Sequence, residues 1–337
     1  MKPIFQFLYF KILFLLIINA CTHDPFDISV KNIKINTTFN NLDSVLRKSD
    51  EKELAKLKFR FRKQKSDILD YSVSYCFGVN MKSDTSFTNG LKRFYQDDYI
   101  KRLTKTIKKK HGYYTHEKQK LVTAFKRLKV FFPKETIPRK IYFINSLFSS
   151  SVLCTENEIA IGVERYLGPH EKVIQELPNQ QFYTWIKKSM KKEYLARDVV
   201  AGWLMTHYCK ETTENYASEM IRWGKILYFT EASMPNEKEN LVARYTKNQY
   251  DWACKSEGMF WKYLVDNELL FKTDEKTRAN LLSEGPFTSG LPKESPDRLG
   301  QFLGWRIVKQ YMENHEISLE KLNKVPYNEL LQNYKAN

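Results

Sequence analysis

The sequence predicts an α+β fold that is predominantly helical, in which a small sheet precedes a helical C-terminal half. Only one region, residues 140–163, contains short runs rich in β-branched and aromatic residues. Beyond Leu167, apolar residues recur at helical spacing almost to the C-terminus. The chain has only 12 Gly and 11 Pro among 337 residues, too few for the many tight turns of an all-β fold.

The elements follow in order from the N-terminus. Leucines on helical spacing predict a helical segment over 38–65, and two basic helical segments follow at 97–110 and 117–131. Pro133 and Pro138 end this pattern, and strands are predicted at 140–145, 151–155 and 158–163. The remaining predicted helices cover 181–191, 197–209, 214–229, 245–265, 296–314 and 327–333.

The first residues have the features of a secretory signal. Lys2 and Lys11 precede an apolar run that is too short to span a bilayer, and Ala20-Cys21 ends a sequence that resembles a bacterial lipobox. We therefore expect a lipoprotein signal peptide at 1–20 and lipid on Cys21, which would anchor the chain in an envelope membrane facing the periplasm. An ordinary signal peptide or a short membrane anchor stays open, and so does the choice between inner and outer membrane. The mature part, 21–337, divides into a helical and sheet portion (21–190) and a helical half (191–337).

The segment SPDRLGQFLGWRIVKQYM predicts a helix with an unusual face. Ser295 suits an N-cap and Pro296 the first turn. Gly300 and Gly304 lie four residues apart and therefore on one side of the helix. Because Gly costs about 1 kcal/mol relative to Ala inside a helix, we expect this face to pack closely against another helix, with the close approach of a ligand as the alternative.

Charge and cysteine content limit the function classes. The formal net charge is +16, and residues 92–140 hold 16 Lys or Arg against four acids. Nucleic acid is an improbable partner for a secreted chain, so the basic region is either a solvated surface or a site for anionic lipid, glycan or an acidic partner. An even number of cysteines besides Cys21 permits two disulfides, although buried free thiols are equally consistent with their spacing: Cys76, Cys154, Cys209 and Cys254.

Several blocks of the sequence resemble one family, the gliding-motility lipoproteins of the GldB type. The blocks are EIAIGVERYLG from Glu158, EMIRWGKILYF from Glu219, Tyr245-Thr246, Trp252 with Glu257 and Trp261, GPFT from Gly285, and the helix from Ser295. The resemblance implies an envelope lipoprotein needed for gliding, with protein partners in the motility and secretion machinery. It also implies a layout similar to predicted zinc metallopeptidases, that is, a degenerate zincin-like domain.

The chemistry of such a peptidase is missing from the sequence. A zinc site of this type needs two His at i and i+4 with a Glu between them, and the segment 197–209 holds only His207. The next helix has Trp223 before Gly224, where a third ligand is expected. His207 with Cys209 could form at most a partial site. We therefore expect no catalytic residue, no metal and no cofactor.

The resemblance leaves a former substrate cleft as the candidate site. The residues expected to line it are Glu219, Tyr228, Glu257, Trp261 and Arg306. Glu257 could equally be a buried acid paired with Arg306 or with a lysine. The leading hypothesis is a non-catalytic scaffold that holds another component of the motility or secretion apparatus. The alternatives are an active periplasmic hydrolase and a lipid- or glycan-binding lipoprotein that uses residues 92–140.

Overall fold

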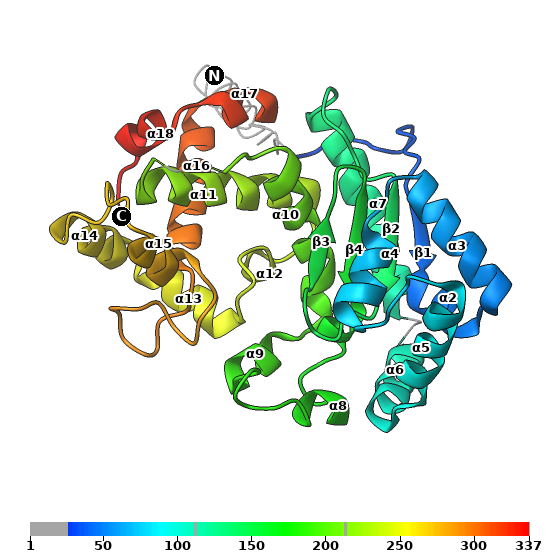
Figure 1. The fold of residues 1–337 in the computed structure, drawn as a ribbon. Coiled ribbons are helices and arrows are strands. Elements are labelled where there is room, and N and C mark those ends of the chain that lie inside the picture. Colours follow the sequence, from blue (N-terminus) through cyan, green and yellow to red (C-terminus); the bar gives the residue numbers. More distant parts are fainter. Residues whose placement is uncertain (1–25, 111–112, 212–213, 337) are drawn as a thin grey trace, which may run out of the picture.

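A four-stranded mixed sheet forms the centre of one half of the molecule (Figure 1). The computed structural model describes residues 26–110, 113–211 and 214–336, so the predicted signal peptide and Cys21 lie outside the described residues. The strand order is β1-β2-β4-β3, with β1 (Thr38–Asn41), β2 (Lys140–Ile144) and β4 (Glu158–Gly162) parallel. The edge strand β3 (Val152–Cys154) runs antiparallel to β4. The α+β class and the three strands predicted from sequence are thus confirmed.

Strand β1 was missed by the sequence analysis, which predicted helix from residue 38. Phe39 pairs with Ile141 of β2, so the segment is held extended by a strand that lies about 100 residues later in the chain. The helix begins only at α2 (Leu42–Lys48), where Asn41 caps it by accepting a hydrogen bond from the Ser44 amide at 2.8 Å. Long-range pairing outweighs the local pattern here.

The sheet carries helices on both faces. Tyr142 and Ile144 belong to a hydrophobic cluster with α2, α3 (Glu51–Lys63), the short α4 (Ile68–Asp70) and α5 (Asp84–Gln96). Ile141 and Phe143 point to the opposite face, where α7 (Tyr113–Phe131) and α10 (Leu195–His207) pack. This alternation follows from the two-residue period of a strand. The larger cluster continues through α10 into the helices that follow it.

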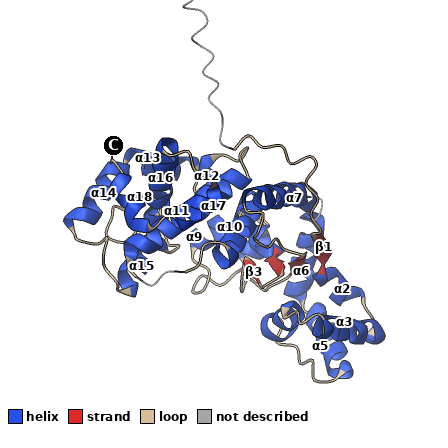
Figure 2. Ribbon diagram, turned by 90° about the horizontal axis from the view of Figure 1, so that it is seen from above, coloured by secondary structure: helices blue, strands red, loops and turns tan. Residues whose placement is uncertain are grey.

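The helical half is assembled around α11 (Tyr216–Ser233) and α16 (Leu299–Asn314). Figure 2 shows this half at the end of the molecule opposite to α2, α3 and α5. The predicted helix over 245–265 is two helices separated at Ser256, and the one over 181–191 is shorter than predicted. The other helices are α6 (Asp98–Lys110), α8 (Lys172–Gln175), α9 (Thr184–Ser189), α12 (Glu239–Val242), α13 (Lys247–Lys255), α14 (Glu257–Asp266), α15 (Glu275–Leu282), α17 (Leu319–Lys324) and α18 (Tyr327–Asn333).

The glycine face of α16 packs against α11, as the sequence predicted. A Cβ atom added to Gly304 would overlap the carbonyl oxygen of Met220, and one added to Gly224 would overlap the carbonyl oxygen of Gly304. A Cβ on Gly300 would overlap the hydroxyl of Tyr216. The two backbones are therefore in direct contact where the helices cross, and only glycine fits at the crossing.

The predicted start of α16 was wrong. The helix begins at Leu299, and Ser295 does not cap it. The carbonyl of Pro296 instead accepts hydrogen bonds from the Thr288 amide at 3.0 Å and the Thr288 hydroxyl at 2.7 Å. Arg298 then adopts a left-handed conformation with φ of 54°, which interrupts helical geometry before Leu299. Tertiary contacts hold residues 295–298 outside the helix.

All four cysteines in the described part of the chain are free thiols. Burial raises the pKa of both Cys154 and Cys209 to about 12; it also raises the pKa of Cys254, but the Cys254 side chain is exposed. Because the thiolate is the reactive form, we expect Cys254 to be alkylated first at pH 8, and Cys154 and Cys209 only after unfolding. Peptide mass spectrometry after iodoacetamide treatment, with and without denaturant, checks this order. Equal labelling of Cys209 and Cys254 in the native protein would contradict the burial of Cys209.

Candidate functional site

Three of the predicted site residues meet in one cluster. Glu257, at the start of α14, accepts hydrogen bonds from Arg306 Nε at 2.8 Å and from the Tyr334 hydroxyl at 2.9 Å. The ring of Trp261 packs edge-on against Tyr334, with centroids 5.0 Å apart. The buried carboxylate of Glu257 thus joins α14, α16 and the segment after α18. The sequence left open whether Glu257 lines a cleft or is a buried acid with a basic partner. In the structure it is buried and forms an ion pair with Arg306.

Glu219 and Tyr228 are not part of a common cleft. They are nine residues apart on α11, which places them on opposite faces and about 13 Å apart along the helix axis. Glu219 is paired with Arg222 at 2.7 Å and lies in a hollow between α11 and α15. Tyr228 is buried and packs edge-to-face on Phe26. The five predicted residues therefore do not define one site.

The position of the expected zinc helix is occupied by α10, which packs between β3 and α11. The ring of His207 stacks on Trp203 with centroids 3.6 Å apart, and its two nitrogens lie 3.2 and 3.1 Å from the carbonyls of Trp203 and Glu156. Cys209 Sγ faces Asn323 instead. Within residues 26–110, 113–211 and 214–336, no three His, Cys, Asp or Glu side chains group closely enough to hold a metal ion.

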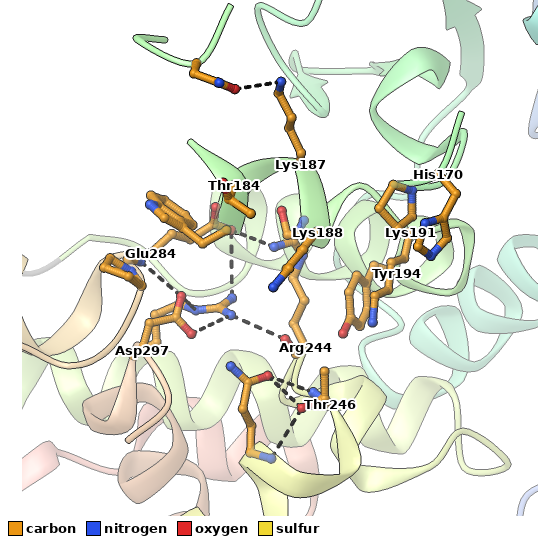
Figure 3. Close-up of a pocket in the computed structure, with 18 of the residues that line it drawn as sticks. His170, Thr184, Lys187, Lys188, Lys191, Tyr194, Arg244, Thr246, Glu284 and Asp297 are labelled. Carbon is orange, nitrogen blue, oxygen red and sulfur yellow. Dashed lines mark hydrogen bonds and ion pairs between the residues drawn. The ribbon is translucent and has the colours of Figure 1, made fainter. Parts of the chain in front are cut away.

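A cavity of about 890 Å³ lies between the segment from Pro169 to Tyr194 and the loops that precede α13 and α16 (Figure 3). Its volume falls within the usual range for pockets that bind small molecules. Trp185 and Tyr194 supply aromatic surface, and Thr184, Ser189, Thr246 and Gln249 supply neutral polar groups. Five basic and two acidic side chains also line it: Lys187, Lys188, Lys191, Arg244, Arg298, Glu284 and Asp297.

Two arginines form the floor of this cavity, and both are almost fully buried. Arg244 donates from Nε to Asp198 at 3.1 Å and from Nη1 to Glu284 at 2.9 Å. Arg298 donates to both carboxylate oxygens of Asp297, at 3.0 and 3.1 Å, and lies 3.8 Å from Glu284. Burial opposes ionisation of Glu284, but Arg244 and Arg298 outweigh it and hold the pKa of this carboxyl below its usual value. The floor is therefore a fixed array of charges.

Both arginines also have a strained backbone. The φ angles of Arg244 and Arg298 are 60° and 54°, in the left-handed region that residues other than Gly rarely adopt. Each such residue costs about 1–3 kcal/mol and persists only where the surroundings impose it, commonly at functional sites. Here the carbonyl of Arg244 accepts a bond from Arg298 Nη2 at 3.3 Å, and Arg244 lies over the ring of Tyr194. Both strained residues line the same cavity.

The lysines of the cavity differ in their surroundings. Lys187 Nζ is held by the carbonyls of Gln175 and Leu177 and by the Asn179 side chain, so it fixes the wall. Lys188 is exposed and in Figure 3 points towards the centre of the cavity, above Arg244. Lys191 lies near Tyr194 and His170, with its ammonium 5.9 Å from the Tyr194 ring centroid.

The sequence analysis did not predict this cavity. The sequence did contain an indication of the cavity. Three of the segments that resemble the GldB family contribute residues to its lining: Tyr245-Thr246, Gly285–Thr288 and the start of the segment from Ser295. What could not be read from the sequence is that Arg244 and Arg298, 54 residues apart, meet over Asp198 and Glu284.

Comparison with known proteins identifies the family. The family described as gliding motility protein GldB matches residues 23–336, nearly the whole chain. The chain belongs to this family, and it is therefore a gliding-motility lipoprotein of the cell envelope. No curated protein and no solved structure gave a match. Within the described residues, no helix has both the length and the apolar character needed to span a membrane.

Proposed function

We propose that this protein is a non-catalytic scaffold that holds another protein of the motility or secretion apparatus in the cavity above Arg244 and Arg298. The observation that carries the proposal is the preformed cavity itself, whose floor is fixed by buried ion pairs and whose rim carries the exposed Lys188 and the partly buried Lys191. A site whose charges are already held in place loses little conformational freedom on binding. The degenerate zincin-like ancestry and the periplasm-facing lipid anchor on Cys21 belong to the same proposal.

The non-catalytic part of the proposal is supported by the roles of the candidate residues. The carboxylate of Glu257 is used to join helices, and His207 packs at the end of α10. Stoichiometric zinc in protein purified without added metal, lost in the His207→Ala variant, would overturn this part and favour a hydrolase.

Filling the cavity tests the holding role directly. Thr184 is exposed on the cavity wall, so Thr184→Trp would occupy the cavity without disturbing the core. We expect a deletion strain complemented with this variant to lose colony spreading, while wild-type protein restores it. Thr123→Trp, at an exposed position of α7 outside the cavity, is the matched control and should restore spreading. Equal protein levels are verified by immunoblot. Normal spreading with Thr184→Trp would show that the cavity does not hold the partner.

A further inference from the structure

We infer that the cavity takes an acidic peptide segment, and that Lys188 and Lys191 bind the side-chain carboxylates of its Asp or Glu residues. This inference rests on the proposed function, because it names the chemistry of the segment that the partner would present.

The cavity has more positive than negative side chains in its lining. The two acids in its lining, Glu284 and Asp297, are already matched by Arg244 and Arg298. Lys187 is held by two carbonyls and an amide oxygen, so its charge faces the wall. The ammonium groups of Lys188 and Lys191 remain, and no ion pair involves either of them within the described residues. The cavity therefore has two positive groups available to a ligand.

Both lysines lie at the rim of the cavity. Lys188 lies above Arg244 near the centre of Figure 3, and Lys191 stands beside Tyr194 to its right. The charges of Arg244 and Arg298 below them are balanced by Asp198, Glu284 and Asp297, so the uncompensated positive charge lies at the rim, and a concave site focuses its potential. An anionic group entering between the two lysines would meet positive potential at the rim of the cavity.

Carboxylates carried on a peptide fit this arrangement better than a compact dianion. The positive groups at the rim are separate point charges on flexible stems, which suit monoanionic groups spaced along a chain. A phosphate drawn down to the arginines would face the carboxylates of Glu284 and Asp297, which already occupy those guanidinium groups. Thr184 on the wall offers a neutral hydroxyl group to a main-chain amide. The net charge of +16 favours attraction of an acidic segment from a distance.

Binding of a defined probe tests the inference. The probe is a short fluorescent peptide in which Glu alternates with Ser, and its control carries Gln at each Glu position. The protein is the full chain in non-ionic detergent, and binding is followed by fluorescence anisotropy. We expect the Glu peptide to bind and the Gln peptide not to bind. The Lys188→Glu/Lys191→Glu variant should bind about tenfold more weakly, with a reduced dependence on salt.

A second charge reversal controls for net charge. Lys108→Glu/Lys109→Glu removes the same charge from two exposed lysines of α6, outside the cavity, and should leave binding unchanged. Equal weakening by both double variants would show non-specific attraction and overturn the inference. So would equal binding of the Gln peptide, or displacement of the Glu peptide by inorganic phosphate or by a uronate oligosaccharide at a lower concentration than by unlabelled peptide.

The two proposals fail in different ways. If Thr184→Trp abolishes spreading but the Glu peptide does not bind wild-type protein, the cavity holds a partner of another chemistry and only this inference is wrong. If the Glu peptide binds and Thr184→Trp spreads normally, the holding role in motility is wrong while the acidic-peptide site stands.

Discussion

Gly304→Ala is expected to destabilise the protein by roughly 3 kcal/mol, a large effect for one methyl group. The added Cβ would overlap the carbonyl oxygen of Met220 and lie 3.3 Å from the Gly224 nitrogen. Both are backbone atoms of α11, so no side chain can rotate away to make room. The helices α11 and α16 would have to separate, and the residues around the crossing are buried. Urea unfolding followed by tryptophan fluorescence measures the change.

Gly202→Ala supplies a control within the same fold. Gly202 lies inside α10, and a Cβ there would make ordinary contacts with Val152 Cγ1 at 3.4 Å and Cys154 Sγ at 3.6 Å. Because Ala favours helix over Gly by about 1 kcal/mol, this variant should be as stable as wild type or more stable. A Gly304→Ala protein with the unfolding midpoint of wild type would show that the helices do not cross at this distance.

Arg298→Met is expected to destabilise the fold by about 3–5 kcal/mol, because it leaves buried carboxylate charge without its partner. Arg298 makes two hydrogen bonds to Asp297 at 3.0 and 3.1 Å, and its side chain is 7% exposed. Met retains similar volume and the same left-handed backbone cost, so the main change is the loss of charge. The additional substitution Asp297→Asn removes the unpaired charge and should recover part of the stability.

Arg102→Met is the matched control for this prediction. Arg102 pairs with Glu176 at 2.8 Å, yet its side chain is 50% exposed. Exposed pairs contribute little to stability, because water solvates the remaining charge after the partner is removed. Thermal or urea unfolding of the three variants beside wild type separates the effects. An Arg298→Met protein that loses no more stability than Arg102→Met would show that the cavity floor is open to solvent.

The local sequence was enough to predict those elements in which the residue pattern and the tertiary contacts favour the same secondary structure. The strands from Lys140 onwards and the glycine face of α16 follow from residue types and spacing alone. Where long-range contacts compete with the local pattern, the prediction failed. β1 is extended because β2 pairs with it, and Ser295 is displaced from its capping position because Pro296 bonds to Thr288.

The sequence by itself determined the α+β class, the family and the absence of a zinc-binding pair of histidines, since these depend on residue identity and on short, regular spacings. Only the tertiary structure decided which side chains meet and where the cavity lies. It placed Glu219 and Tyr228 on opposite faces of α11 and brought Arg244 and Arg298 together over Glu284. Such contacts join residues tens of positions apart in loops, and their geometry is set by the packing of the helices around them rather than by any local period.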